Sequence, residues 1–244
     1  MSAKATLVLG GSSALGEELV GRLLNQNHKV AAHYFENADG LNQLKEKFPG
    51  QIFPIRADLN SVDDIKNLIK QVEEKMGCPE AIVHLASDRP EPLRFKEINW
   101  NTVETNINIQ VRSVFDVLQH FLPTMSQRKS GKVVFALTSY VLGVPPTNLS
   151  HYVVAKYALL GLMKSLASEY ASKSININSV SPSMIETQFL KKLPEKLVEL
   201  NAAKMPLKRN AMVADVIPAI EFLLSPGANY MCGVNIPVSG GSSF

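Results

Sequence analysis

The stretch LGGSSALGEEL, residues 9–19, decides the fold because it joins a strand-like run to a helix-like one. The apolar run ATLVLG (5–10) leads into it, and apolar residues at three-and-four spacing follow it. Gly10, Gly11 and Gly16 therefore lie where a strand passes into a helix, so that backbone amides and the positive helix end can face a phosphate. The turn predicts a strand–turn–helix unit of the nucleotide-binding kind.

Two familiar phosphate-binding motifs do not fit this turn. Gly11 and Gly16 have the spacing of a Walker loop, but Glu17 and Glu18 stand where that motif needs Lys and Ser or Thr. The GxGxxG fingerprint is absent as well. Taken alone, these residues also fit a tight turn that binds no ligand.

The alternation of strand-like and helix-like segments continues through all 244 residues, 45% of which are apolar. The strand-like runs are nearly continuous in apolar residues, as expected where helices cover both faces of a sheet. They are residues 5–10, 29–35, 52–57, 80–86, 132–139, 175–182 and 233–239. We predict an α/β protein, with residues 1–244 forming a single Rossmann-type, doubly wound parallel sheet of about seven strands with helices on both faces.

Composition excludes several classes of function. The formal net charge of +3 and the scattered Lys and Arg residues do not favour nucleic acid as a partner. No apolar run reaches the roughly 18–20 residues of a membrane helix, and the N-terminus lacks a signal peptide's apolar region. Cys78 and Cys232 have no CxxC partner, and the five His residues lack the spacing of a metal site. We expect a cytoplasmic protein without metal, membrane or nucleic-acid partner.

Positions after the second and third runs bear on a dinucleotide. In folds that prefer NAD, an acidic side chain usually follows the second strand and bonds the ribose 2′-hydroxyl. We align Tyr34 with that residue, although Glu36 follows closely. The missing carboxylate removes a repulsion against a 2′-phosphate, so the pattern favours NADP, but no Arg stands beside it and NAD is not excluded. Asp58 suits the adenine amino group or a plain turn.

The stretch SYVLGVPPTNLSHYVVAK (139–156) carries the candidate chemistry. Tyr152 and Lys156 are four residues apart and project together from one face of a predicted helix. A neighbouring ammonium favours the phenolate and lowers the pKa of a phenol from its ordinary value near 10. Ser139, thirteen residues before Tyr152, arrives from the end of the preceding strand and can hold a substrate carbonyl oxygen.

In this order the motifs resemble those of the short-chain dehydrogenase/reductase family over nearly the whole chain. The matching pieces are GGSSALG (10–16), ADL (57–59), HLAS (84–87), Ser139, YVVAK (152–156), SPSMIET (181–187) and CGVNIPVSGG (232–241). The resemblance implies that Tyr152 donates a proton, Ser139 positions the carbonyl, and Lys156 binds the nicotinamide ribose and lowers the pKa of the phenol. The nicotinamide supplies the hydride.

The resemblance also implies a set of cofactor contacts and a reaction. The expected contacts are Gly10, Ser12, Ser13, Leu15, Gly16, Tyr34, Asp58, Leu59, Ala86, Ser87, Tyr152, Lys156, Pro182, Ile185 and Thr187. The expected reaction is NADP(H)-dependent reduction of a ketone, foremost a 3-oxoacyl thioester on acyl carrier protein. The alternatives are a tailoring ketoreductase, a small-alcohol dehydrogenase and a cofactor-binding regulator without turnover.

The chain departs from the family pattern at several positions. Leu9 and Ala14 replace a Thr and a Gly of the first turn, and the Ala14 methyl stands where backbone and pyrophosphate approach closely. His84 and Ser87 belong to HLAS, which replaces Asn-Asn-Ala-Gly, and Ser183 replaces a Gly. These changes touch the cofactor loop and leave Ser139, Tyr152 and Lys156 unchanged.

The family's relay Asn aligns with Gln110, which we expect to hold a proton-relay water from one methylene farther away. Asn106 and Asn108 lie near and stay open as alternatives, as does a structural role for Gln110.

Partner predictions come from the resemblance and from charge. Lys129 and Lys173 match basic positions of carrier-dependent relatives, and we expect them on the rim near the site, where an acidic carrier protein would be attracted. Residues 184–207 resemble an amphipathic lid with Phe189, Leu190 and Leu193 facing an apolar substrate. Fold analogy predicts a homotetramer or homodimer formed through the helices around 100–126 and 150–172.

Overall fold

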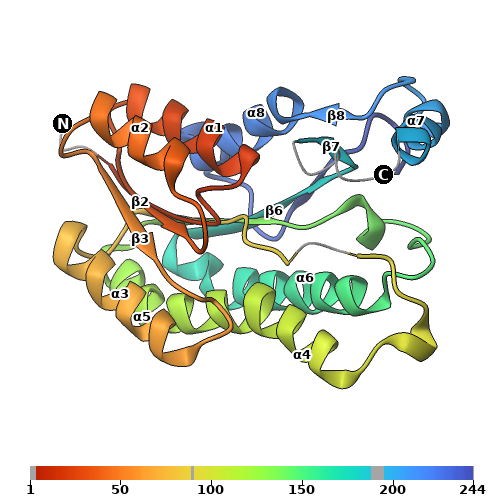
Figure 1. Ribbon diagram of the computed structural model, residues 1–244. Helices are drawn as coiled ribbons and strands as arrows, with labels where there is room; N and C mark the ends of the chain where they lie inside the picture. Colours follow the sequence, from red (N-terminus) through yellow and green to blue (C-terminus); the bar gives the residue numbers. More distant parts are fainter. Residues whose placement is uncertain (1–3, 89–90, 188–194, 244) are drawn as a thin grey trace.

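A computed structural model gives the structure and describes residues 4–88, 91–187 and 195–243. Within these ranges seven parallel strands form one sheet in the order β3-β2-β1-β4-β5-β6-β9 (Figure 1). They are β1 (Ala5–Leu9), β2 (Lys29–Tyr34), β3 (Ile52–Arg56), β4 (Ala81–His84), β5 (Gly131–Ala136), β6 (Ile175–Pro182) and β9 (Asn235–Val238). The predicted Rossmann-type sheet is confirmed.

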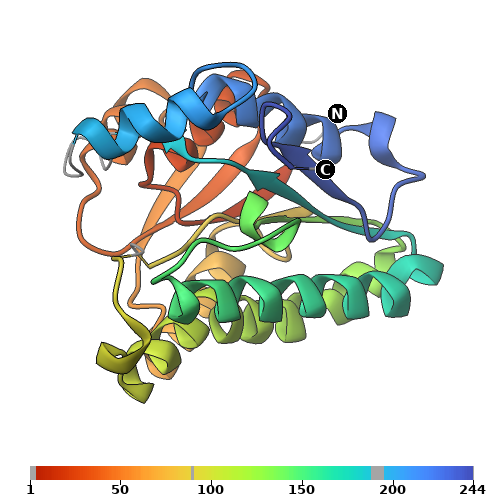
Figure 2. The same cartoon turned by 90° about the vertical axis from the view of Figure 1, so that its right-hand side faces the viewer.

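Helices cover both faces of this sheet (Figures 1 and 2). One layer contains α1 (Ala14–Asn25), α2 (Asp39–Lys47) and α8 (Val213–Leu224). The opposite layer contains α3 (Val62–Met76), α4 (Trp100–Ile107), α5 (Ser113–Arg128) and α6 (Ser150–Tyr170). A short pair of strands, β7 (Ile185–Glu186) and β8 (Ala211–Met212), and helix α7 (Glu195–Lys204) lie on the side of α8. No helix among the described residues is both long and apolar enough to span a bilayer.

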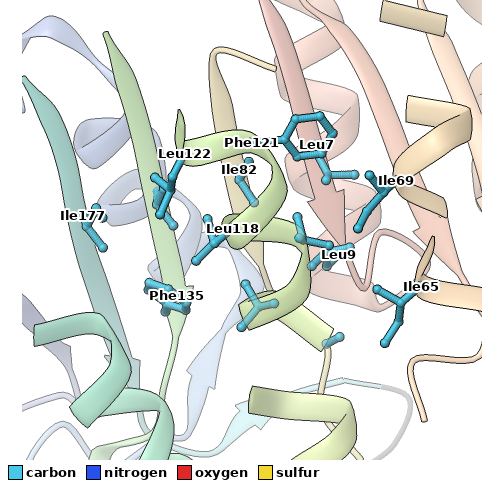
Figure 3. Packing of buried hydrophobic residues seen from close by; sticks show 14 of the residues in the cluster. Leu7, Leu9, Ile65, Ile69, Ile82, Leu118, Phe121, Leu122, Phe135 and Ile177 are labelled. Carbon is cyan, nitrogen blue, oxygen red and sulfur yellow. The ribbon is translucent and has the colours of Figure 1, made fainter. Parts of the chain in front are cut away.

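Each helical layer packs against its face of the sheet through a separate apolar cluster. Figure 3 shows the cluster on the side of α5, where Leu118 and Phe121 face strand residues such as Phe135. Phe121 and Phe135 are at most 1% exposed, and burying such a side chain contributes about 1.5–3 kcal/mol. The other cluster includes Leu19 of α1 and Ile217 of α8. The two clusters hold the sheet between rigid layers.

Serine caps fix where two of the helices begin. The Ser13 hydroxyl accepts a hydrogen bond from the Gly16 N–H at 3.0 Å, and the Ser61 hydroxyl accepts one from the Asp64 N–H at 3.3 Å. Each bond satisfies an N–H that the first helical turn would leave without a partner. The first helix therefore begins immediately beyond the glycine turn that follows β1.

The strand order reverses at β1, which places a crevice at the sheet's carboxyl edge. β1 pairs with β2 on one side and with β4 on the other. Because the connections after β1 and β4 lead to opposite faces, the chain separates there, and ligands of doubly wound sheets bind in such crevices. The residues that follow β1, β2, β3 and β4 line this edge.

The helical segment from Trp100 onward is interrupted. We expected one continuous helix, but a π-helical turn, η2 (Asn108–Arg112), separates α4 from α5. Single π-helical turns inside α-helices are rare overall, but those that occur are often found at functional sites. Gln110 lies in the middle of this turn.

Candidate active site

Tyr152 and Lys156 lie side by side on α6, as their spacing predicts. The Lys156 Nζ is 5.5 Å from the centroid of the Tyr152 ring. Lys156 is only 2% exposed, and its ammonium donates a hydrogen bond to the Ala136 carbonyl oxygen at 2.8 Å. Ala136 ends β5, so this bond fixes the first turns of α6 against the carboxyl edge of the sheet.

Burial dominates the protonation of both groups. It lowers the pKa of Lys156 from 10.5 to about 7. It also raises the pKa of Tyr152, although hydrogen bonds with Thr138 and Ser87 lower it in part. Burial therefore outweighs the hydrogen bonds to the phenol, and the expected lowering of its pKa by Lys156 stays a prediction. Moving the Tyr152 phenolate out of water costs more free energy than the neighbouring hydrogen-bonding groups recover. At neutral pH the Lys156 amine is itself only partly charged.

Ser139 follows β5 directly after an extended threonine. It is 9% exposed and begins a short 3-10 turn, η3 (Ser139–Val141). Thr138 is extended and 6% exposed, and its hydroxyl accepts a hydrogen bond from the Tyr140 N–H at 3.4 Å. The predicted role of Ser139 in positioning a carbonyl oxygen stays a prediction.

Gln110 belongs to a buried polar network centred on His84. Gln110 is fully buried, and its backbone oxygen lies 2.8 Å from His84 Nε2, which as the donor carries the proton. The Gln110 side-chain amide donates to Asn106 Oδ1 at 3.0 Å. Burial lowers the pKa of His84 to about 3, so the imidazole stays neutral. Two buried atoms, His84 Nδ1 and Gln110 Oε1, have no hydrogen-bond partner among the described residues, and they are the groups that a relay water held by Gln110 would bond.

A cavity of about 440 Å³ lies in the crevice at the carboxyl edge of the sheet. Seven of the expected cofactor contacts line it: Gly10, Ser12, Ser13, Asp58, Leu59, Ala86 and Ser87. They come from the ends of β1, β3 and β4, which are far apart in sequence. Hydroxyls and backbone N–H groups of the first turn can donate hydrogen bonds and the Asp58 carboxylate can accept them, a combination that fits the adenosine half of a dinucleotide.

The glycines of the first turn permit close backbone packing. Gly10 has a φ of +83°, and a Cβ atom there would come within 2.7 Å of the Ala86 backbone nitrogen. A Cβ on Gly16 would come within 2.3 Å of the Gly10 carbonyl oxygen. The turn therefore lies directly against the end of β4. Leu15 and Gly16 are buried inside this packing, so they shape the turn.

The residues after β2 that face the cavity differ from the aligned one. Tyr34 packs against the apolar cluster on the side of α1, whereas Phe35, Glu36 and Asn37 line the cavity. The Arg56 guanidinium lies over the Phe35 ring, 5.9 Å from its centroid. Arg56, at the end of β3, therefore places a positive charge beside Phe35, which lines the cavity. Sequence reasoning overlooked it because Arg56 is distant from Phe35 along the chain.

The remaining predicted contacts follow β6 at the same edge of the sheet. Pro182 ends β6, Ile185 pairs with Ala211 in the short sheet, and Thr187 is half-buried. The predicted lid residues Phe189, Leu190 and Leu193 lie outside the described residues.

We expected Lys129 and Lys173 on the rim of the site, and this is wrong: within one chain they lie at the opposite edge of the sheet. Lys129 is the C-terminal cap of α5 and precedes β5, and Lys173 precedes β6 in the turn η4 (Ala171–Lys173). Both lie at the amino ends of parallel strands, opposite the edge that carries Tyr152. A second cavity at that edge, about 570 Å³, is lined by Lys4, Lys129 and Lys132 among others. In the described ranges no three His, Cys, Asp or Glu side chains are grouped to hold a metal ion.

A parallel sheet with a reversal in its strand order, together with the pair Tyr152 and Lys156 on α6, is an arrangement expected of a dinucleotide-dependent oxidoreductase. A family model described as Enoyl-(Acyl carrier protein) reductase matches residues 10–243. The chain belongs to the short-chain dehydrogenase/reductase family, whose members are NAD(P)-dependent oxidoreductases, and the predicted enzyme class is confirmed.

Curated relatives match over the full length. The 3-oxoacyl-[acyl-carrier-protein] reductase FabG of Staphylococcus epidermidis is 30% identical over 243 residues, covering 98% of each chain. The protein of the same name from Thermotoga maritima is 30% identical over 246 residues, covering 99% of this chain and 98% of its own.

Solved structures share the fold. A Serratia marcescens short-chain dehydrogenase/reductase has a TM-score of 0.89 at 23% identity, covering 99% of this chain and 98% of that one. A levodione reductase has a TM-score of 0.88 at 24% identity, covering 98% and 96%.

Proposed function

We propose that the protein reduces the ketone of a 3-oxoacyl thioester on acyl carrier protein, with NADPH as the reductant. The carrying observation is the pair Tyr152 and Lys156, side by side on α6 and fixed to the end of β5 by the bond from Lys156 to Ala136. Ser87, which lines the dinucleotide cavity, lowers the pKa of the Tyr152 phenol in part, and this supports a proton donor near the reacting end of a dinucleotide. The names of the relatives support the choice of substrate.

Each residue has a separate task in this proposal. A bound nicotinamide supplies the hydride. Tyr152 donates its proton to the ketone oxygen, and burial keeps the phenol protonated at neutral pH, so that the proton is present before the reaction begins. Lys156, fixed on Ala136, binds the nicotinamide ribose and supplies positive charge near that oxygen. Gln110 and its network hold the water that returns a proton.

A substrate panel tests the proposal. The family model is described as an enoyl reductase and the curated relatives as 3-oxoacyl reductases. The panel must therefore distinguish reduction of a ketone from reduction of a carbon–carbon double bond. We expect NADPH oxidation with acetoacetyl thioesters and none with crotonyl thioesters, because a phenol protonates an oxygen. Turnover of the crotonyl thioester alone would contradict ketone reduction. Cofactor binding without turnover of any carbonyl would indicate a regulator.

Arg56 supports NADP over NAD as the cofactor. Its guanidinium lies over the ring of Phe35, which lines the cavity beside Glu36, and we expect it to offset the repulsion between Glu36 and a 2′-phosphate. We expect Arg56→Gln to raise the dissociation constant of NADPH about tenfold, equivalent to about 1.4 kcal/mol, and to leave that of NADH unchanged. Fluorescence titration of both cofactors measures this, with Lys66→Gln on α3 as the exposed control. Equal weakening of both cofactors would assign Arg56 a structural role.

Carrier docking and assembly complete the proposal. Because Lys129 and Lys173 lie at the opposite edge, a carrier bound to them would serve a site in another subunit of an oligomer. Charge reversal at both should then raise KM for the carrier-bound substrate and leave KM for a short thioester unchanged.

The exposed apolar residues on α4, α5 and α6 support a homodimer or homotetramer. They are Trp100, Phe115, Val154 and Tyr157. The free thiols Cys78 and Cys232 fit a cytoplasmic location.

A further inference from the structure

We propose that His33 is a positioning residue for the dinucleotide: its neutral imidazole fixes the glycine turn after β1, and protonation of the ring releases that turn. The inference rests on the dinucleotide binding that the proposed function requires, and it does not depend on which substrate is reduced. His33 lies in β2 one residue before Tyr34, and the pattern of the sequence assigned it no role.

Both ring nitrogens of His33 are in hydrogen bonds. The Gly10 N–H donates to His33 Nδ1 at 3.0 Å, and His33 Nε2 lies 3.0 Å from the Ala57 carbonyl oxygen. A backbone N–H can only donate and a carbonyl oxygen can only accept, so Nδ1 is the acceptor and Nε2 carries the proton. The side chain is 4% exposed. The neutral Nε2–H tautomer is therefore the form that fits this site.

The backbone of His33 adds a second connection to the same turn. The Gly11 N–H donates to the His33 carbonyl oxygen at 2.7 Å, so two successive N–H groups of the turn are bound to one residue of β2. On its other side Gly10 lies against the end of β4, where an added Cβ would come within 2.7 Å of the Ala86 nitrogen. The turn is therefore held between β2 and β4, and the bond to Ala57 ties it to the end of β3.

These bonds determine which groups of the turn remain for a phosphate. Because the N–H groups of Gly10 and Gly11 are bound to His33, the phosphate donors come from the residues that follow, beginning with Ser12, which lines the cavity. The Ser13 N–H and hydroxyl both donate to the Gly10 carbonyl oxygen, at 3.2 and 2.8 Å. A change at Gly10 therefore reaches the start of α1, whose first N–H groups are expected phosphate donors.

Protonation would break the bond that fixes Gly10. A protonated imidazole has two N–H donors, so Nδ1–H would face the Gly10 N–H, and two donors cannot bond each other. Burial lowers the pKa of His33 from its ordinary value of 6.5, although the bond to Ala57 and the Asp58 carboxylate raise it in part. The neutral form is therefore present at neutral pH, and the bond to Gly10 is lost as the pH falls below that pKa.

The charged and titratable groups around His33 come from the neighbouring elements, while the glycine turn carries none. The end of β3 brings Arg56 and Asp58, and Asp64 at the start of α3 accepts a hydrogen bond from the Asp58 N–H. The end of β4 brings His84, whose pKa burial lowers to about 3. His84 therefore stays neutral at pH 5 and above, and does not contribute to a pH dependence in that range.

Three variants and a fluorescence titration with NADPH at pH 7.5 test the role of His33. In His33→Asn the amide oxygen takes the place of Nδ1 and accepts from the Gly10 N–H without titrating, so the dissociation constant should stay close to that of the wild type. His33→Leu leaves this N–H without an acceptor and should raise the dissociation constant about tenfold, the effect of one lost buried hydrogen bond. His28→Asn is the matched control, because His28 precedes the opposite end of β2, and it should bind as the wild type does.

The pH dependence separates positioning of the turn from support of the fold. As the pH falls from 7.5 to 5, the wild-type dissociation constant should rise, approaching tenfold per pH unit below the pKa of His33, because binding then requires the release of one proton. His33→Asn should lack this rise. Titration of the 2′-phosphate is common to both proteins and cancels in the comparison. A histidine that only supports the fold would change the thermal unfolding temperature when replaced and leave the two pH dependences equal.

A measurement on the cofactor-free protein tests the hydrogen bond itself. Nitrogen-15 NMR of the imidazole rings reports which ring nitrogen carries the proton, and the His33 signals are identified by their absence from His33→Asn. We expect the Nε2–H tautomer at pH 7.5. The amide resonance of Gly10 should shift on acidification with the same midpoint as the ring.

The outcomes distinguish this inference from the proposed function. The Nδ1–H tautomer, a His33→Leu variant that binds NADPH as tightly as the wild type, or equal pH dependences in the wild type and His33→Asn would each overturn the role of His33. A wild type that binds NADPH with the expected pH dependence and reduces no ketone would contradict the proposed function alone. A wild type that binds no dinucleotide would contradict both.

Discussion

Replacing Tyr152 by Phe is expected to lower kcat for ketone reduction about 1,000-fold, within the usual range for a lost general acid. The variant keeps the ring that packs beside Lys156 and loses only the phenolic hydroxyl. Cofactor binding should therefore persist, with a dissociation constant for NADPH close to that of the wild type. Steady-state NADPH oxidation and a fluorescence titration measure the two quantities.

Tyr157→Phe is the matched control, because Tyr157 is on the same helix and is 44% exposed. It should leave both quantities unchanged. A Tyr152→Phe variant that retains more than a tenth of the wild-type kcat would show that another group donates the proton.

Replacing Lys156 by Met is expected to abolish most turnover while stabilising the fold. Burial lowers the pKa of this amine to about 7, so the folded protein disfavours a charge that the unfolded chain carries freely. Met fills a similar volume without that cost, and within the described part of the chain the substitution removes the hydrogen bond to the Ala136 carbonyl oxygen. We expect a gain of about 2 kcal/mol in the free energy of unfolding at pH 7, from the pKa difference less one hydrogen bond.

The pH dependence of stability gives the sign of this effect. Between pH 7 and 10.5 the unfolded chain binds the proton of Lys156 and the folded chain releases it, so wild-type stability should rise with pH from this group. Below about pH 7 the penalty is fully present. In Lys156→Met this part of the rise should vanish, and in the exposed control Lys164→Met it should remain. Denaturant unfolding at pH 7 and 9 measures the rise in the free energy of unfolding. A Lys156→Met variant less stable than the wild type would contradict the claim that the buried amine destabilises the fold.

The fold follows from local patterns of the sequence. The glycine turn after the first apolar run, together with alternating strand and helix signals, was sufficient to predict the parallel sheet and both helical layers. The spacing of Tyr152 and Lys156 placed them on one helical face, because four residues nearly complete a turn. These predictions depend on short-range geometry, which a sequence expresses directly.

The parts of the site that sequence could not give depend on long-range packing. The raised pKa of Tyr152 results from burial by distant segments, and no spacing reports burial. Arg56 meets Phe35 because β3 lies beside β2 in the sheet, with Tyr34 opposite Arg56 in register. Lys129 precedes β5, so it lies at the amino edge of the parallel sheet, whereas the site residues follow the strands at the carboxyl edge.

Transfer of deuterium tests most directly whether Tyr152 and Lys156 serve ketone reduction beside a bound nicotinamide. The protein would be supplied with acetoacetyl thioester and NADPH deuterated at the transferable C4 position, and the product analysed by mass spectrometry and NMR. The account predicts one deuterium on the carbon of the new alcohol, and no such product from Tyr152→Phe on the same timescale. Label at a carbon derived from an alkene when crotonyl thioester is supplied, or an unlabelled alcohol, would contradict it.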